Sequence, residues 1–134
     1  MNNINNNYKN QHLINIVAEF YKYYYNHTVH GINTVFEIFH PNISCMVEGN
    51  YLQGSYNLLI WFANQGIHRF EYNNLSGISQ ILNNNDILIN VNGCIRTISL
   101  WNQSTNWLRF NELFILENIG NKYVVKNYII STFN

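Results

Sequence analysis

The stretch Ser-Cys-Met-Val-Glu-Gly-Asn-Tyr-Leu-Gln-Gly, residues 44–54, joins two short runs of mixed apolar and polar residues through a glycine-bearing turn. Glycine adopts the backbone angles that tight turns require, which other residues avoid. The stretch therefore predicts a short strand, a turn and a short return strand. Glu48 lies at the turn, between the apolar Val47 and the flexible Gly49.

Helical patterns flank this hairpin on both sides. Before it, two apolar stripes recur at helical spacing, and the second ends at His40-Pro41 because proline disfavours helix in the residue that precedes it. The stripes are Leu13, Ile16, Val17, Phe20 and Tyr24, and then Ile32, Val35, Phe36 and Phe39. After the hairpin, a third helix is expected over residues 55–64, with Ser55 as its N-cap and Gly66 as its terminator. Its inward side chains would be Leu58, Leu59, Phe62 and Ala63.

From His68 onward the period changes to alternation, which is typical of half-buried strands. Strands are expected over 68–82, 87–95, 108–116 and 123–132, with turns at 83–86 and 120–121 and a polar loop at 101–107. This order predicts an α+β fold in which three N-terminal helices pack on a strongly curved, mostly antiparallel sheet. Residues 1–10 are expected to be a flexible Asn-rich tail, and residues 11–134 a single domain.

Composition narrows the possible partners. Hydrophobic residues make up 47% of the 134 residues and charged residues only 10%, with a formal net charge of zero. The sequence has no surplus of basic residues to neutralise phosphates, so nothing in its charge favours nucleic-acid binding. No apolar run is long enough to span a membrane. The N-terminus lacks the pattern of a signal peptide, so an intracellular protein is expected. Low charge favours self-association. Cys45 and Cys94 are expected to be reduced thiols.

Several motifs in order resemble those of the nuclear transport factor 2 family, from about Leu13 to Ile130. The segment Glu48–Gly54 resembles the family's E-G-x-x-apolar-Q-G. The other matching positions are Phe20, Tyr24 and Tyr25 in the first helix, Gly93, the F-x-x-x-F-x-L of Phe110, Phe114 and Leu116, and Asn127. The resemblance implies a cone-shaped fold, a homodimer formed through the open face of the sheet, and residence in the cytoplasm and nucleus.

The same resemblance implies partners and contact residues. The founding carrier binds the Phe-Gly repeats of nuclear pores and the GDP form of a Ran-like GTPase, whereas other branches are scaffolds or enzymes. Three positions depart from the carrier's pattern: Val47 replaces a pocket tryptophan, Leu13 a tryptophan used for Phe-Gly binding, and Arg96 stands where the carrier is acidic. An arginine there reverses the charge that would meet a basic GTPase surface, although an apolar-peptide binder remains compatible.

The residues expected to contact a partner are Val47, Glu48, Leu13, Arg96, Trp101 and Trp107. Glu48 fits either a carboxylate satisfied at the end of a strand or a rim contact to a partner's lysine or arginine, and less well a general acid or base. The two tryptophans bracket the polar loop and fit binding hot spots or core anchors equally. A further set is expected in the dimer interface or the core: Phe110, Phe114, Tyr123 and Val125.

Catalysis has weaker support. The one aspartate, Asp86, lies in an Asn-rich turn where a solvated carboxylate is expected, and the pairs His68–Glu71 and His40–Glu48 are the remaining acid–base candidates. His27 and His30 are three apart, but nothing nearby completes a metal site. No metal, no cofactor and no catalytic residue is expected. The alternatives are a small-molecule cavity protein, an enzyme of the dehydratase or isomerase type, or a repurposed scaffold.

Overall fold

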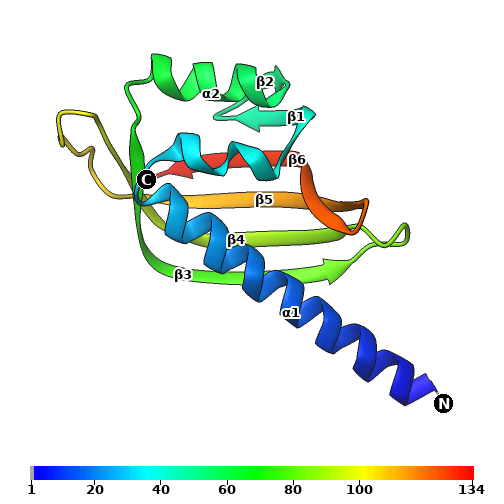
Figure 1. Ribbon diagram of the computed structural model, residues 1–134. Helices are drawn as coiled ribbons and strands as arrows, with labels where there is room; N and C mark the ends of the chain where they lie inside the picture. The colour runs from blue at the N-terminus through cyan, green and yellow to red at the C-terminus, as the bar shows by residue number, and fades with distance from the viewer. Residues whose placement is uncertain (1) are drawn as a thin grey trace.

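The computed structural model describes residues 2–134, with side chains described from Asn10 onward. Within this range three helical segments pack against a single six-stranded sheet (Figure 1). The elements are α1 (Asn2–Thr28), η1 (Ile32–Ile38), β1 (Phe39–Val47), β2 (Asn50–Gln53), α2 (Ser55–Asn64), β3 (Arg69–Ile81), β4 (Ile87–Ile98), β5 (Leu108–Ile119) and β6 (Lys122–Phe133). The strand order in the sheet is β2-β1-β6-β5-β4-β3.

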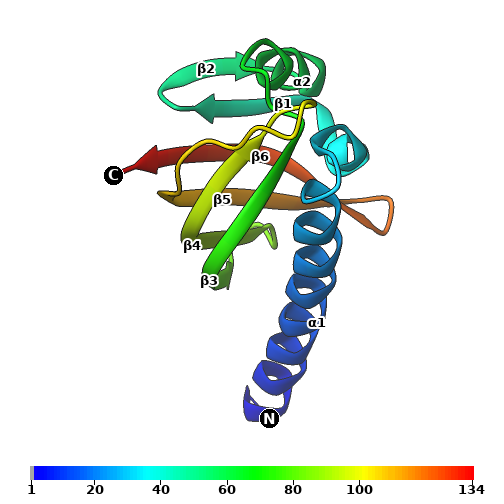
Figure 2. The ribbon, with the colours of Figure 1, turned by 90° about the vertical axis from the view of Figure 1, so that its left-hand side faces the viewer.

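Helix α1 crosses one face of the curved sheet, and its N-terminal part projects beyond the sheet edge (Figure 1, Figure 2). Aromatic side chains anchor it, because Phe20 and Tyr24 both meet Phe114 of β5, with ring centroids 4.7 and 4.9 Å apart. The helix begins at Asn2, so residues 2–10 are helical where the sequence predicts a tail. The flexibility of that segment stays a prediction.

The fold is α+β, but the three helices of the sequence expectation are not three α-helices. The second stripe forms a 3-10 helix, η1, whereas α2 follows the β1–β2 hairpin at the expected place. The sheet is also mixed, since β1 pairs with β6 in parallel. That pairing shifts register between Phe39 and Ser44, around Pro41, where a residue without a backbone N–H is tolerated.

The hairpin and the third helix confirm the prediction for residues 44–64. Strands β1 and β2 pair antiparallel from Ser44↔Gln53 to Val47↔Asn50, and α2 spans Ser55–Asn64. One detail was wrong: the N-cap is Gly54, at φ 94°, and no side chain caps the helix. Gly66, at φ 74°, follows the last turn, as expected of a terminating glycine.

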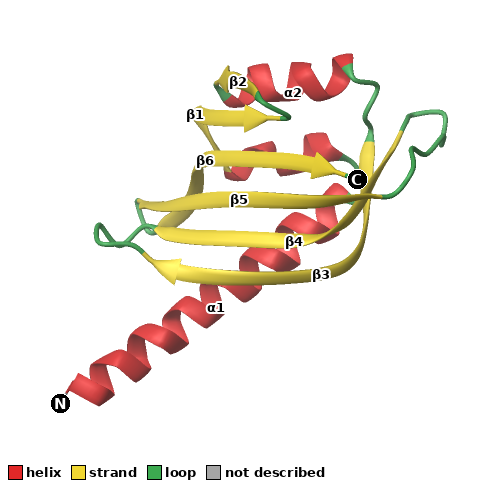
Figure 3. Cartoon of the chain, turned by 180° about the vertical axis from the view of Figure 1, so that it is seen from behind, coloured by secondary structure: helices red, strands yellow, loops and turns green. Residues whose placement is uncertain are grey.

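One face of the sheet is covered by helices and the other face is open. Figure 3, which is turned by 180° from Figure 1, has the open face toward the viewer. Alternate residues of β5 separate the two: Phe110, Glu112, Phe114 and Leu116 are buried toward the helices, while Asn111, Leu113 and Ile115 face the other way. Cys45 and Cys94 are both free thiols, as predicted. No helix within residues 2–134 has the length and apolarity needed to cross a membrane.

Candidate functional site

A pocket of about 280 Å³ opens at the end of the sheet where β6 ends and β3 begins. We call it the end pocket. Its floor is apolar and buried, because the inward faces of five strands and of α2 converge there, and its rim is polar. The floor includes Val47, Phe62, Phe70, Ile95 and Ile130, each at most 5% exposed. The rim includes Glu48, Gln65, Arg96, Thr97, Thr105 and Thr132, while Trp61, Ile67 and Leu108 complete the lining.

Glu48 stands exposed on the rim, in the turn between β1 and β2. Its backbone has a φ of 51°, an uncommon angle for a residue with a side chain. Its N–H donates to the Ile130 carbonyl at 3.0 Å, and Thr132 Oγ1 donates to its carboxylate at 3.0 Å. These two bonds tie the turn to β6 and hold the carboxylate at the pocket mouth. No cation among residues 10–134 forms an ion pair with it.

Arg96 lies on the rim and belongs to a charged cluster. Glu71, its cross-strand partner, accepts from Arg96 Nε at 2.7 Å and from Arg69 at 3.3 Å. The hydrogen bond from Arg96 is the main reason that the pKa of Glu71 is lowered. The Arg96 guanidinium also lies 4.7 Å from the ring centre of Trp107. Two arginines therefore share one carboxylate, and this cluster keeps a formal charge of +1.

A second hollow, of about 440 Å³, adjoins the cluster and is lined by Val29, Arg69, Glu71, Tyr72, Arg96 and Trp107. We call it the arginine hollow. Arg96 lines both this hollow and the end pocket, so the two depressions meet at its side chain. A ligand in the end pocket could thus extend toward the arginine pair without leaving the surface.

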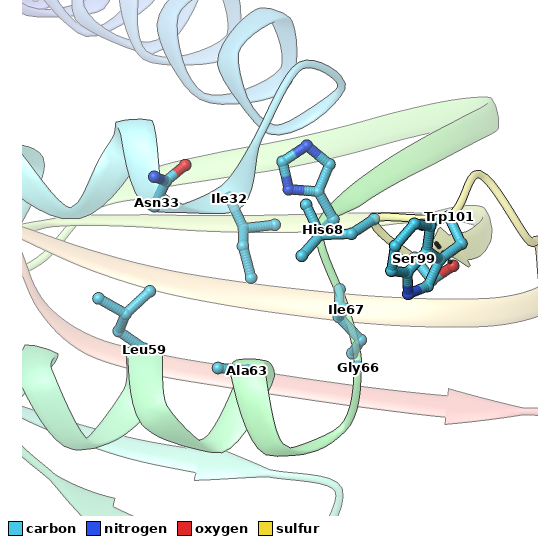
Figure 4. Close-up of a pocket in the computed structure, with 10 residues that line it drawn as sticks. Ile32, Asn33, Leu59, Ala63, Gly66, Ile67, His68, Ser99 and Trp101 are labelled. Carbon is cyan, nitrogen blue, oxygen red and sulfur yellow. Dashed lines mark hydrogen bonds between the residues drawn. The ribbon is translucent and has the colours of Figure 1, made fainter.

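Trp101 lies elsewhere, beside a hollow of about 470 Å³ between η1, α2 and the β4–β5 loop (Figure 4). Its side chain is 87% exposed, whereas that of Trp107 is 42% exposed and covered in part by Arg96. Leu59, Ala63 and His68 line the same hollow as Trp101. The two loop tryptophans are both exposed, but they border different depressions.

The interior between α1 and the sheet is filled by tyrosines around a buried carboxyl. Glu112 is 0% exposed and accepts from Tyr24 at 2.6 Å, from Tyr25 at 2.8 Å and from Tyr128. Burial raises the pKa of Glu112, and the hydrogen bonds from the three hydroxyls oppose that rise. Burial likewise raises the tyrosine pKa values well above their ordinary value. This interior is a packed polar core rather than an open cavity.

The open face of the sheet carries apolar and uncharged polar side chains in rows. One row crosses five strands through the paired residues Met46, Ile129, Leu113, Asn90 and Ile78. Met46, Ile129 and Ile78 are 37%, 42% and 72% exposed. A neighbouring row contains Ser131, Asn111, Asn92 and Ser76. The Asn111 side-chain oxygen is buried there without a hydrogen-bond partner among the described residues.

The predicted partner-contact residues are therefore distributed over several places. Val47, Glu48 and Arg96 meet at the end pocket, and Trp107 joins them through Arg96. Leu13 is on α1, none of whose described residues lines that pocket, and Trp101 is by the α2 hollow. Phe110, Phe114 and Val125 lie in the core, at most 1% exposed, while Tyr123 packs at its edge beside α1.

The acid–base candidates do not assemble into a catalytic pair. Glu71 is held by arginines and His68 lines the α2 hollow, while the His40 ring accepts from the backbone N–H of Asn42 at 3.0 Å. Asp86 is not solvated as expected, because it is 5% exposed and paired with Lys126. Among the described side chains, no group of three or more His, Cys, Asp or Glu is placed to hold a metal ion.

Several residues of these sites are not predicted from the sequence, among them Trp61, Gln65 and the rim threonines, Arg69, Glu71 as an arginine acceptor, and Glu112. A signal for Glu112 was present, because a charged residue midway between Phe110 and Phe114 in a strand must share their buried face. Trp61 precedes the inward Phe62 on α2 and so lies at the edge of the helix's buried side. The arginine cluster depends on the pairing of β3 with β4, which the alternation pattern does not specify.

Comparisons with known proteins agree on the architecture. No protein-family model matches the sequence, and no curated protein matches it. Among solved structures, nuclear transport factor 2 from Cryptosporidium parvum is 21% identical, with a TM-score of 0.69 over 87% of this chain and 90% of that one. The yeast UBP3-associated protein BRE5 is 15% identical, with a TM-score of 0.66 over 89% and 95% of the two chains.

Enzyme-like structures share the architecture too. A candidate dehydratase of the same structural family from Streptomyces avermitilis is 11% identical, with a TM-score of 0.71 over 92% of this chain and 97% of that one. At these identities the likeness defines the architecture alone, because one fold carries many unrelated functions. The chain adopts the nuclear transport factor 2-like fold.

Proposed function

We propose that the protein is a non-catalytic, dimeric protein-binding module whose end pocket receives one large apolar side chain of a partner. The observation that carries this proposal is the end pocket itself, an apolar floor within a polar rim. Its volume of about 280 Å³ lies just below the range typical of sites for whole small molecules, and it suits a single aromatic ring. Trp61 on one side supplies the kind of wall that aromatic anchors favour.

The rim supports a peptide rather than a free hydrocarbon as the ligand. Thr97, Thr105 and Thr132 carry hydroxyls, and Gln65 an amide, at the mouth of the pocket. Such groups can hydrogen-bond the backbone on either side of an inserted side chain. Glu48, exposed and without an ion-pair partner among the described residues, is placed to attract a lysine or arginine next to the anchor.

The dimeric part of the proposal rests on the open face of the sheet. The row from Met46 to Ile78 exposes apolar side chains, and the two rows named above contain no charged residue. A broad exposed face of this kind is typical of an interface.

A role in nucleocytoplasmic transport follows as the family-based form of this proposal, with Phe-Gly repeats as ligands and with residence in the cytoplasm and nucleus. The structural likeness to nuclear transport factor 2 from Cryptosporidium parvum supports it. A Ran-like GTPase in its GDP form is the less favoured partner. The arginine cluster gives that side of the pocket a positive charge, which would repel the basic surface that the resemblance implies for the GTPase.

The test is a titration of the dimer with a Phe-Gly repeat peptide by calorimetry, together with a pull-down of the GDP-bound GTPase. One buried ring together with a few hydrogen bonds from the rim gives a Kd on the order of 1 mM. Gln65→Trp would cover the pocket mouth from an exposed position and is expected to abolish binding. Asn64→Trp, one residue earlier and outside the pocket, is the matched control. Equal binding by both variants would exclude the end pocket as the site.

A small-molecule cavity protein or enzyme is the second candidate, because Glu112 combines a raised pKa with three tyrosine hydroxyls, a set that suits acid–base chemistry. The candidate dehydratase with the same fold adds to it. The burial of Glu112 speaks against this reading, since no part of its side chain reaches the surface. A scaffold role, with the tryptophan loop as the attachment point, would show as partner binding that survives Gln65→Trp.

A further inference from the structure

We infer that the arginine hollow is a carboxylate-binding subsite that extends the end pocket, so that the preferred partner segment carries a carboxylate close to its aromatic anchor. This inference rests on the proposed function, because it names the chemistry of a segment that the end pocket would hold. Its basis is the shared position of Arg96, which lines both depressions.

The charge of the hollow is the first argument. Arg69 and Arg96 carry two positive charges against the one carboxylate of Glu71, and no other acid among the described side chains forms an ion pair with either arginine. Asn102 takes a further Arg69 hydrogen at 2.9 Å as a neutral acceptor. The arginine side chains are 25% and 33% exposed, so both remain open to a ligand. A second carboxylate would neutralise the remaining charge.

The restricted position of Arg96 is the second argument. Its guanidinium lies against the ring of Trp107 and donates to Glu71, so these two contacts hold the side chain in place before a ligand arrives. A planar guanidinium held in this way loses little freedom when it binds a second carboxylate. This distinguishes the hollow from mobile surface lysines.

The opposite charge across the end pocket is the third argument. Glu48 lines the pocket from the β1–β2 turn, whereas Arg96 lines it from β4. A segment with an aromatic residue between a basic and an acidic neighbour would satisfy both groups in one orientation. The reversed orientation would bring like charges together on both sides, so the rim would also select the direction of the bound chain.

The experiment compares matched peptides on the intact protein by NMR titration, with the Trp107 indole N–H signal as a local reporter. Both peptides contain one Phe, and they carry either Asp or Asn near it, with the substituted position tested on each side of the Phe. The Asp peptide is expected to bind about fivefold more tightly in its better arrangement and to shift the Trp107 signal. High salt is expected to remove the difference but not the binding.

Variants separate the subsite from the pocket. Arg69→Gln lies outside the end pocket and is expected to reduce the preference for Asp while leaving the Asn peptide unaffected. Arg96→Gln is expected to abolish the preference. Arg109→Gln, which contacts Phe133 and lines neither depression, is the control and should behave as the wild type.

The outcomes distinguish the two levels of the proposal. Equal affinity of the wild type for the Asp and Asn peptides would overturn the carboxylate-binding subsite and leave the end pocket as a binding site. Binding of neither peptide would remove the aromatic anchor and with it both the proposed function and the subsite. An Asp preference that persists in Arg69→Gln and Arg96→Gln would place the carboxylate elsewhere and also overturn the inference.

Discussion

The Tyr25 hydroxyl donates to Glu112 Oε1 at 2.8 Å in the buried space between α1 and the sheet. Tyr24 and Tyr128 donate to the other oxygen, so a carboxyl that is fully removed from water is surrounded by three donors. Burying a carboxylate without such partners would be very costly. The bonds join helix α1 to strands that lie far along the chain, and they position the helix on the sheet.

Replacement of Glu112 tests this arrangement. Glu112→Leu leaves three tyrosine hydroxyls without their acceptor in a dry interior, so we expect a loss of about 3 kcal/mol in the free energy of unfolding. Glu112→Gln keeps an acceptor and removes the charge, and it is expected to lie within about 1 kcal/mol of the wild type at neutral pH. Urea denaturation followed by circular dichroism measures both. A Leu variant as stable as the Gln variant would contradict the account.

The pH dependence of stability should reveal the raised pKa of Glu112. Because the folded-state pKa exceeds the unfolded one, the folded protein holds the proton more tightly. That contribution is present at low pH and is lost as pH rises through the folded pKa. The wild type should therefore gain stability relative to Glu112→Gln as pH falls from 8 toward the ordinary Glu pKa of 4.5. A constant or opposite difference between the two proteins would show that the pKa is not raised.

An ion pair between Asp86 and Lys126 lies at the start of β4 and is expected to contribute to stability. Asp86 is 5% exposed, accepts from Asn84 at 2.8 Å and pairs with Lys126, whose pKa the pairing raises. Lys126→Met would leave this carboxylate without its cation, at an expected cost of about 1–2 kcal/mol by urea denaturation. Lys122→Met, an exposed lysine in the same strand, is the control. Equal stability of the two variants would mean that the pair contributes little.

If the open face of the sheet is a dimer interface, the wild-type protein should be a dimer in solution. Sedimentation equilibrium is expected to give twice the chain mass of 15.9 kDa for the wild type. Ile129→Lys places a charge in the apolar row at a side chain that is already 42% exposed, so it should produce a folded monomer. Ile14→Lys, at an exposed position of α1, should stay dimeric. A monomeric wild type would refute the dimeric part of the proposal.

The parts of the fold with local signals were predictable from the sequence. The glycine-bearing turn after Val47 and the apolar spacing of Leu58 and Phe62 are short-range features, and the hairpin and α2 follow them closely. The 3-10 form of η1 was not predictable, because apolar spacing near Val35 fits either type of short helix. The parallel pairing of β1 with β6 is a long-range contact for which the alternation carries no information.

The candidate site was predictable only in part, for a similar reason. Val47, Glu48 and Arg96 were expected to contact a partner, and they do share one pocket. The arginine cluster was not predictable, because Arg69 and Glu71 are neighbours on one face of β3 but Arg96 joins them only through the register between β3 and β4. The burial of Asp86 was not predictable either, because its partner Lys126 lies where β6 shifts register against β5.

The most direct test of the end pocket is an NMR map of the amide shifts that a Phe-Gly peptide causes in the labelled protein. The account predicts the largest changes at residues that line this pocket and not the hollow beside Trp101, in the segments 47–48, 61–62, 95–97 and 130–132. Changes centred instead on α1 and Tyr123, or on the hollow beside Trp101, would contradict it, as would a spectrum that the peptide leaves unchanged.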